Sequence, residues 1–141
     1  MPSGKLLNIV LLSIATFILH GVEEGVAGFY LVDRSYLLTV GRLGGDPAMT
    51  FMAYQAILWG ILFAGYLLIK RGTWRKPLLM ALGIVMVLEL QHVWETAVTE
   101  KYYPGSYTAM AFPVLALLLY LAFHDSRRMQ KLLAKKENDS R

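Results

Sequence analysis

Hydrophobic residues form four long stretches separated by short polar segments, and this alternation dominates the chain. The stretches cover about Leu6–Phe29, Ala48–Ile69, Pro77–Val98 and Pro104–Phe123. Each has about the 20 mostly apolar residues that a helix needs to cross a bilayer. The strict apolar–polar alternation that indicates strands is absent. The pattern therefore predicts an all-α fold, an integral membrane four-helix bundle. Pro113 should bend the last helix, because proline interrupts the helical hydrogen bonds.

The composition fits a membrane protein better than a soluble domain. Of the 141 residues, 56% are hydrophobic, and the mean hydropathy is +0.46. Soluble domains contain about 45–50% apolar residues. The chain has no cysteine, which excludes disulfides, thiolate metal ligands and a cysteine nucleophile. We therefore expect one four-span membrane domain over residues 1–124, followed by a basic tail over residues 125–141.

The positive charges indicate how the helices are oriented. The net charge of +4 gathers mainly in the loop Lys70–Lys76 and in the tail, whereas the other two loops mix acidic and basic residues. Basic residues in short loops stay on the cytoplasmic side of a membrane. Both termini should therefore be cytoplasmic. Because the charges set orientation, they indicate no nucleic-acid partner.

Two of the four stretches carry ionisable residues in their interior. They are His20, Glu23 and Glu24 in the first stretch, and Glu89, His92 and Glu95 in the third. Such residues cost about 2.5–3.5 kcal/mol each to insert and usually mark functional sites. Residues three or four apart share one face of a helix. A rise of about 1.5 Å per residue puts both groups at a similar depth in the outer half of the membrane. We therefore predict that they form one joint site.

A weak internal repeat supports the joint site. A shift of 72 positions places His20 on His92 and Glu23 on Glu95. The two halves of the chain would then be two helical hairpins of the same orientation, related by a pseudo-twofold axis along the membrane normal. Such an axis would bring the two His-x-x-Glu faces together.

Three motifs give the chain a resemblance to a known family. In order, they are His20-Gly21-Val22-Glu23-Glu24, a second histidine at His92, and Tyr102-Tyr103-Pro104-Gly105. Together with the hydrophobic stretches, over about Leu6 to Phe123, they resemble the HXXEE family of membrane proteins, which is named for the first motif. The resemblance implies an integral membrane protein in which these motif residues matter. It implies no activity, because the function of that family is unknown.

Clustered imidazoles and carboxylates suit a divalent metal such as Zn, Fe or Mn. The segment Glu89–His92 supplies a Glu-x-x-His, as in di-iron carboxylate bundles, although here only two helices supply ligands instead of four. We expect a metal-dependent membrane enzyme that acts on an apolar or amphipathic, lipid-like substrate. The candidate catalytic residues are Glu23, Glu89 and Tyr102. The candidate ligands of one or two ions are His20, Glu23, Glu24, Glu89, His92 and Glu95.

Three other interpretations stay open at this stage. Clustered carboxylates repel, so some should stay protonated and could serve a metal-free isomerase or cyclase. Intramembrane His and Glu also mark proton paths, which suggests a proton-coupled transporter or channel subunit. Because four spans are few for transport, that function would need a homo-oligomer. Finally, His–Glu hydrogen bonds could simply join helices, at about 0.6 kcal/mol each.

Overall fold

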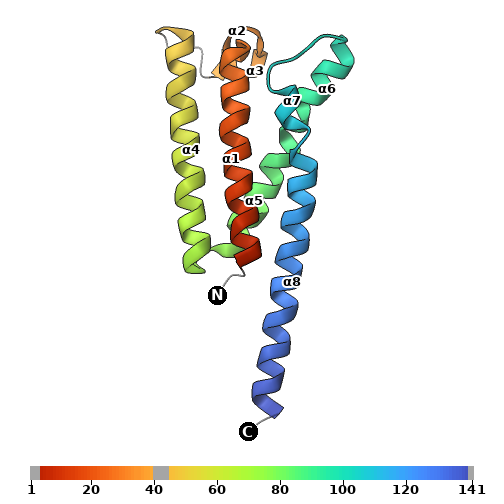
Figure 1. Ribbon diagram of the computed structural model, residues 1–141. Coiled ribbons are helices and arrows are strands. Elements are labelled where there is room, and N and C mark those ends of the chain that lie inside the picture. Colours follow the sequence, from red (N-terminus) through yellow and green to blue (C-terminus); the bar gives the residue numbers. More distant parts are fainter. Residues whose placement is uncertain (1–3, 40–44, 140–141) are drawn as a thin grey trace.

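The computed structural model describes residues 4–39 and 45–139, and the regular elements within these ranges are helices (Figure 1). They are α1 (Gly4–Val26), α2 (Phe29–Val32), α3 (Arg34–Thr39), α4 (Pro47–Arg71), α5 (Arg75–Leu88), α6 (Leu90–Thr99), α7 (Ser106–Ala109) and α8 (Phe112–Asp139). Four segments are long and apolar enough to cross a membrane, namely Gly4–Val26, Pro47–Arg71, Arg75–Thr99 and Ser106–Ser126. The prediction of four membrane helices in an all-α bundle is therefore confirmed.

The first helix, α1, lies at the centre of the bundle. It packs against α4 on one side and α8 on the other, and α5 packs against both α8 and α4. The helical segment α8 continues beyond the bundle into the region predicted as a separate tail (Figure 1). Two short helices, α2 and α3, lie at the opposite end, where α2 packs against α1 and α4. The bundle thus has one end built of long helices and another end where short segments surround the helix termini.

The boundaries of α4 follow directly from the local sequence. The side chain of Asp46 accepts a hydrogen bond from the Met49 amide at 2.8 Å, and Pro47 occupies the first helical turn. An acceptor at the N-cap and a proline just after it are both typical of helix starts. The helix ends at Gly72, whose φ of 81° is left-handed and favours glycine.

Two of the spanning segments are interrupted near the predicted site. The third divides at Glu89, where the His92 amide donates to the Glu89 carbonyl at 3.2 Å, a tighter turn than that of an α-helix. The fourth is interrupted between α7 and α8, directly before Pro113. The predicted irregularity at Pro113 therefore falls at the first turn of α8, where a missing amide is tolerated.

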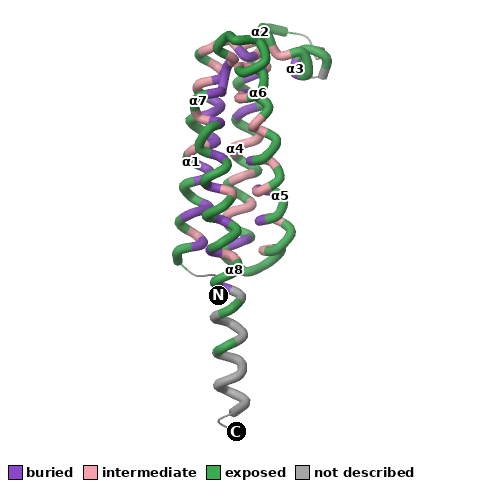
Figure 2. Tube along the Cα trace, turned by 90° about the vertical axis from the view of Figure 1, so that its right-hand side faces the viewer, coloured by how far each residue is buried: buried purple, intermediate pink, exposed green. Residues whose placement is uncertain are grey.

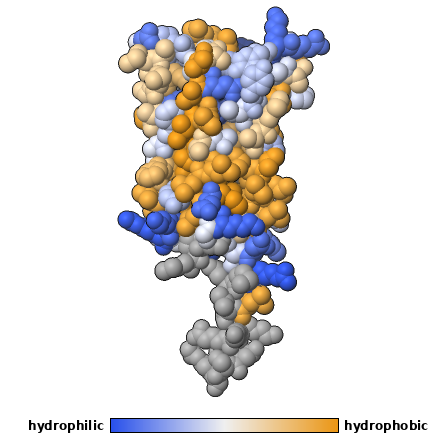
Figure 3. All heavy atoms as spheres, viewed as in Figure 1, coloured by the Kyte–Doolittle hydropathy of each residue, from blue (hydrophilic) through white to orange (hydrophobic). Residues whose placement is uncertain are grey.

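Buried positions lie along the inner faces of the helices (Figure 2), and apolar residues cover much of the face of the bundle that Figure 3 shows. The buried core includes Leu6, Val10, Phe17, Met86 and Phe112. Large apolar residues such as Leu19, Ile57 and Leu117 are 60%, 64% and 58% exposed. An apolar exterior of this kind is stable in lipid, where helices are held together by packing contacts instead of by the hydrophobic effect.

Labelling of introduced cysteines tests the predicted orientation. Thr73 follows α4 and Lys101 follows α6, and both are exposed. Because the chain has no cysteine, Thr73→Cys and Lys101→Cys each create a single thiol, with the unmodified protein as the blank. A membrane-impermeant maleimide should label Lys101→Cys on intact cells, and Thr73→Cys only after lysis. Labelling of both cysteines from the same side would show that the segment Arg75–Thr99 does not cross the membrane.

Candidate functional site

Four of the six predicted ligand residues meet near the end of the bundle that carries α2 and α7. His20 and Glu24 come from α1, Glu89 from the break between α5 and α6, and His92 from α6. His20 and His92 are 3% and 1% exposed, and Glu24 is 5% exposed. The two imidazole rings have centroids 4.8 Å apart and meet edge to face. The structure therefore brings the two histidines together, as the joint site predicted.

The Nε2 atoms of both histidines face carboxylate oxygens. Oε2 of Glu89 lies 3.2 Å from Nε2 of His20 and 3.2 Å from Nε2 of His92. Oε1 of Glu24 lies 3.4 Å from Nε2 of His92 and 3.7 Å from Nε2 of His20. His20, Glu89 and His92 each offer one possible ligand atom, and these three atoms lie within 4.8 Å of one another. His20, Glu89 and His92 thus form a group that could hold a metal ion, and Glu24 adjoins this group through its contacts with the two rings.

The Nδ1 atoms of both histidines bind protein oxygens on the opposite side. Nδ1 of His92 lies 2.7 Å from the carbonyl oxygen of Pro104. A carbonyl only accepts, so this nitrogen carries a hydrogen. Nδ1 of His20 lies 2.7 Å from the hydroxyl of Thr108, which itself lies 2.6 Å from a Glu23 oxygen and 3.2 Å from the Gly105 carbonyl.

The Thr108 contacts also settle the tautomer of His20. Both of the other neighbours of the Thr108 hydroxyl are acceptors, so its single hydrogen is used on one of them and its oxygen accepts from His20 Nδ1. In the neutral form of both rings, Nε2 therefore has no hydrogen and points its lone pair at the carboxylates. A lone pair and a carboxylate oxygen repel unless a cation lies between them. The arrangement can consequently hold a metal ion or an extra proton.

The side chain of Glu24 is oriented by α4. Nε2 of Gln55 donates to Oε2 of Glu24 at 2.8 Å, and both side chains are buried. This approach depends on Gly21 in the first motif, because a Cβ there would lie 2.6 Å from Oε1 of Gln55. Gly21 thus lets α4 come close enough to position Glu24.

Glu23 has a different set of partners from its neighbour. Its carboxylate accepts from the amides of Tyr107 and Thr108 at 3.1 and 2.9 Å, and from the Tyr102 hydroxyl at 2.8 Å. The two amides belong to the first turn of α7, where helices leave N–H groups without internal partners. Glu23 therefore anchors the start of α7 to α1. Neither Glu23 nor Tyr102 is in contact with the two imidazoles through these bonds.

The Tyr102 phenol stays neutral over the physiological range. Desolvation and the bond to the Glu23 carboxylate raise the pKa of Tyr102 to about 12. The phenol therefore keeps its hydrogen and acts as a donor to Glu23, which leaves it as a further anchor of the same helix junction. Its predicted catalytic role stays a prediction.

Glu95 lies away from the group that the other residues form. It is exposed on α6, whereas His92 on the same helix is buried.

The sequence did not reveal Thr108 and the Pro104 carbonyl, which hold the two histidines. It also missed the bond from the Tyr103 hydroxyl to Asp33 at 2.6 Å, which ties the loop to the α2–α3 junction. Backbone carbonyls carry no sequence signal, so the Pro104 contact was not accessible to pattern analysis.

The segment Tyr102–Gly105 closes the outer side of the site. Gly105 has a left-handed φ of 90°. A Cβ there would lie 2.6 Å from Cε1 of His20 and 3.1 Å from Nδ1 of His92. Only glycine therefore fits, both for its conformation and for its contact with the two rings.

A cavity of about 120 Å³ adjoins the four side chains. Besides the site residues, its wall includes the polar side chains of Tyr54 and Gln91 and the apolar side chains of Phe17 and Leu58. The side chain of Glu89 is 19% exposed, against 7% for that of Glu24. Glu89 is therefore the more accessible carboxylate neighbour of the two rings.

A pair of glycine substitutions tests the close packing over the rings. Gly105→Ala should destabilise the protein by about 2–5 kcal/mol, the sum of left-handed strain and overpacking. Gly72→Ala is the control, because Gly72 has a φ of 81° but no atom within 4 Å of its Cβ position. It should cost only about 1–2 kcal/mol. The stability of both variants is measured by thermal melts in detergent. Equal destabilisation by the two substitutions would contradict the close contact of Gly105 with the two rings.

Comparison with known proteins adds one finding to this geometry. Residues 11–121 match the family described as a protein of unknown function with an HXXEE motif. No curated protein and no solved structure matches the chain. The match covers all three motifs that build the site, and the chain belongs to the HXXEE family.

Proposed function

We propose that this protein is a metal-dependent membrane enzyme that binds one divalent ion between His20, Glu24, Glu89 and His92 and acts on an apolar or amphipathic substrate. The observation that carries the proposal is the orientation of the two imidazoles. Both rings donate from Nδ1 to protein acceptors and turn an unprotonated Nε2 toward carboxylate oxygens. A cation at the centre converts this repulsive arrangement into an attractive one.

The distances between the facing atoms suit a metal ion, and one of them, from Nε2 of His20 to Oε2 of Glu89 at 3.2 Å, is also within hydrogen-bond range. Charge-assisted N–H···O bonds are about 2.7–2.9 Å long. The four Nε2–carboxylate contacts are longer, at 3.2, 3.2, 3.4 and 3.7 Å. Bonds of about 2.0–2.1 Å from zinc to nitrogen or oxygen place tetrahedral ligand atoms roughly 3.3–3.4 Å apart. Three of the four contacts are close to such ligand-to-ligand edges, and the contact between Glu24 and His20 is longer.

The surroundings of the ligands also suit a metal. Imidazoles that bind metal usually donate their other N–H to a carbonyl, carboxylate or similar acceptor, which orients the ring. Pro104 and Thr108 provide these acceptors, and Gln55 orients Glu24. We propose one ion, since Glu23 is engaged by α7 and Glu95 is exposed. The donor set suits Zn, Fe or Mn.

An enzyme is favoured because the site borders a cavity large enough to admit a reacting group. A divalent ion in this position would lower the pKa of a bound water or polarise a substrate oxygen. Glu89 lines the cavity together with Tyr54 and Gln91. These side chains can orient a polar group, and the Glu89 carboxylate can accept a proton from it. A metal-free isomerase, a proton path and a purely structural role remain as competing outcomes of the tests below.

Metal content and metal-dependent stability test the proposal directly. The purified protein should contain a single divalent ion per chain, and His92→Ala should lose it. Binding to the folded state alone stabilises by about 2.7 kcal/mol at a hundredfold excess over Kd. Chelator should therefore lower the melting temperature of wild type and leave that of His92→Ala unchanged. His124→Ala is the matched control, because His124 is exposed on α8 and stacks on Tyr120. No metal, with equal melting losses in chelator and in buffer, would overturn the proposal.

A substitution at Glu23 separates anchoring from metal binding. Glu23→Gln removes the charge that the α7 amides and the Tyr102 hydroxyl bind, which should cost about 1–3 kcal/mol. Because Glu23 reaches the ion only through Thr108 and His20, most of this loss should persist in chelator. Metal content at saturation should stay that of wild type. If Glu23→Gln instead loses the ion, and is as stable as wild type when both are chelated, Glu23 is a metal ligand.

A further inference from the structure

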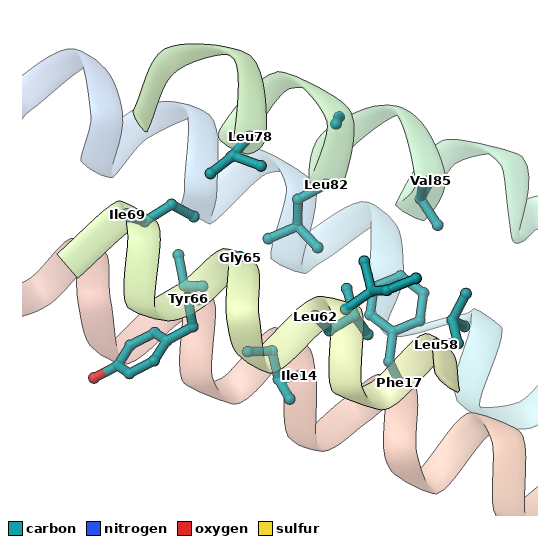
Figure 4. Close-up of a pocket in the computed structure, with 13 residues that line it drawn as sticks. Ile14, Phe17, Leu58, Leu62, Gly65, Tyr66, Ile69, Leu78, Leu82 and Val85 are labelled. Atoms are coloured by element: carbon teal, nitrogen blue, oxygen red, sulfur yellow. The ribbon is translucent and has the colours of Figure 1, made fainter. Parts of the chain in front are cut away.

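An apolar pocket of about 190 Å³ lies directly inward of the site, between α1, α4 and α5 (Figure 4). Its side chains include Ile14 from α1, Leu62 from α4, and Leu82 from α5. Phe17 and Leu58 line both this pocket and the polar cavity of the site. Figure 4 shows Phe17, Leu58 and Val85 at one end, and Ile69 and Leu78 at the other. The apolar pocket and the polar cavity are thus neighbours that meet at Phe17 and Leu58.

The pocket is accessible from the side of the bundle that faces lipid. Ile61, on its rim, is 63% exposed, and Ala81 on the opposite helix is also exposed. The helix α4 is the least buried of the four spans, with 11% of its apolar window buried against 44% for α1. A molecule dissolved in the bilayer can therefore reach the pocket between α4 and α5 without passing through water.

We infer that the substrate is a single-chain amphipath taken from the bilayer, whose hydrocarbon chain fills this pocket and whose polar end reaches the His/Glu site. This inference rests on the proposed enzyme function. The size of the pocket supports one chain: an apolar cavity of about 150 Å³ holds a benzene molecule, so this one holds roughly six to eight carbon atoms. A longer chain continues into lipid past Ile61, and a second chain has no room.

The polar end of the substrate supplies the selectivity. A hydrocarbon chain gains little on moving from lipid into an apolar pocket, because both surroundings are equally apolar. Retention therefore depends on hydrogen bonds at the outer end, where Tyr54, Glu89 and Gln91 line the cavity. A plain hydrocarbon of equal length lacks these bonds and exchanges freely with the bilayer.

Photolabelling of the protein in phosphatidylcholine nanodiscs tests this assignment. The probe is a ten-carbon primary alcohol with a diazirine at mid-chain, and peptide mass spectrometry locates the adducts. Labels should fall on pocket residues such as Leu62 and Leu82. Gly65→Leu fills the pocket, since no atom lies within 4 Å of the Cβ position of Gly65. It should reduce labelling at least about tenfold, the effect of one overpacked side chain.

Two controls make the result specific. Gly60→Leu adds the same side chain on the same helix, also into open space, but Gly60 does not line the pocket; it should label like wild type. Ala81→Leu fills the pocket from the opposite helix and should repeat the loss of labelling. Helicity and melting temperature, measured on each variant, confirm that it is folded. A diazirine alkane of equal length should label the pocket at least about tenfold less than the alcohol, the loss expected when polar groups stay unpaired.

The outcomes separate this inference from the proposed metal chemistry, because labelling does not need the ion. Pocket labelling that Gly65→Leu leaves unchanged, or equal labelling by alkane and alcohol, overturns the substrate assignment even if the metal is present. Labelling as expected in a protein that contains no metal supports the amphipath pocket while the metal-dependent function fails.

Discussion

The hydrogen bonds made by Nδ1 of His20 and His92 are the constraint on which the rest of the site depends. They decide which nitrogen of each ring faces inward, and hence that two lone pairs meet two carboxylates. Both acceptors come from the segment before α8, not from the helices that carry the histidines. The irregular chain around Gly105 is therefore part of the site, because without it the rings could turn or exchange tautomers.

The two adjacent carboxylates of the first motif have separate tasks because they point to different neighbours. Glu23 binds the amides at the start of α7, and this fixes Thr108, which in turn holds His20. Glu24 faces His92 and receives a hydrogen bond from Gln55 of α4. One turn of α1 thus joins both neighbouring spans to the site. Spacing alone puts the two residues about 100° apart on a helix, which is enough to separate these partners.

The sequence predicted the spans and the meeting of His20 with His92, because hydropathy and burial of charge leave few alternatives in a bilayer. It did not separate the carboxylates by role. The internal repeat paired Glu23 with Glu95, yet Glu23 is bound by α7 while Glu95 is exposed on α6. A helical face is broad, and the rotation of each helix against its neighbours decides which side chains enter the site. That rotation depends on glycine contacts such as Gly21 with Gln55, which periodicity does not report. The pseudo-twofold relation of the two hairpins stays a prediction.

The helix α4 links the polar and apolar parts of the molecule. It supplies Gln55, which orients Glu24, and Gly65, which lines the apolar pocket. It also supplies Leu58, which lines both the apolar pocket and the polar cavity. It is also the least buried span, so much of its surface faces lipid. Because lipid provides no hydrophobic force between helices, packing and the Gln55–Glu24 bond have to hold α4 in place. In the proposed complex, a chain that packs against α4 and α5 would add contacts to the same helix that positions Glu24. Occupation of the pocket would then affect the geometry of the carboxylate through α4.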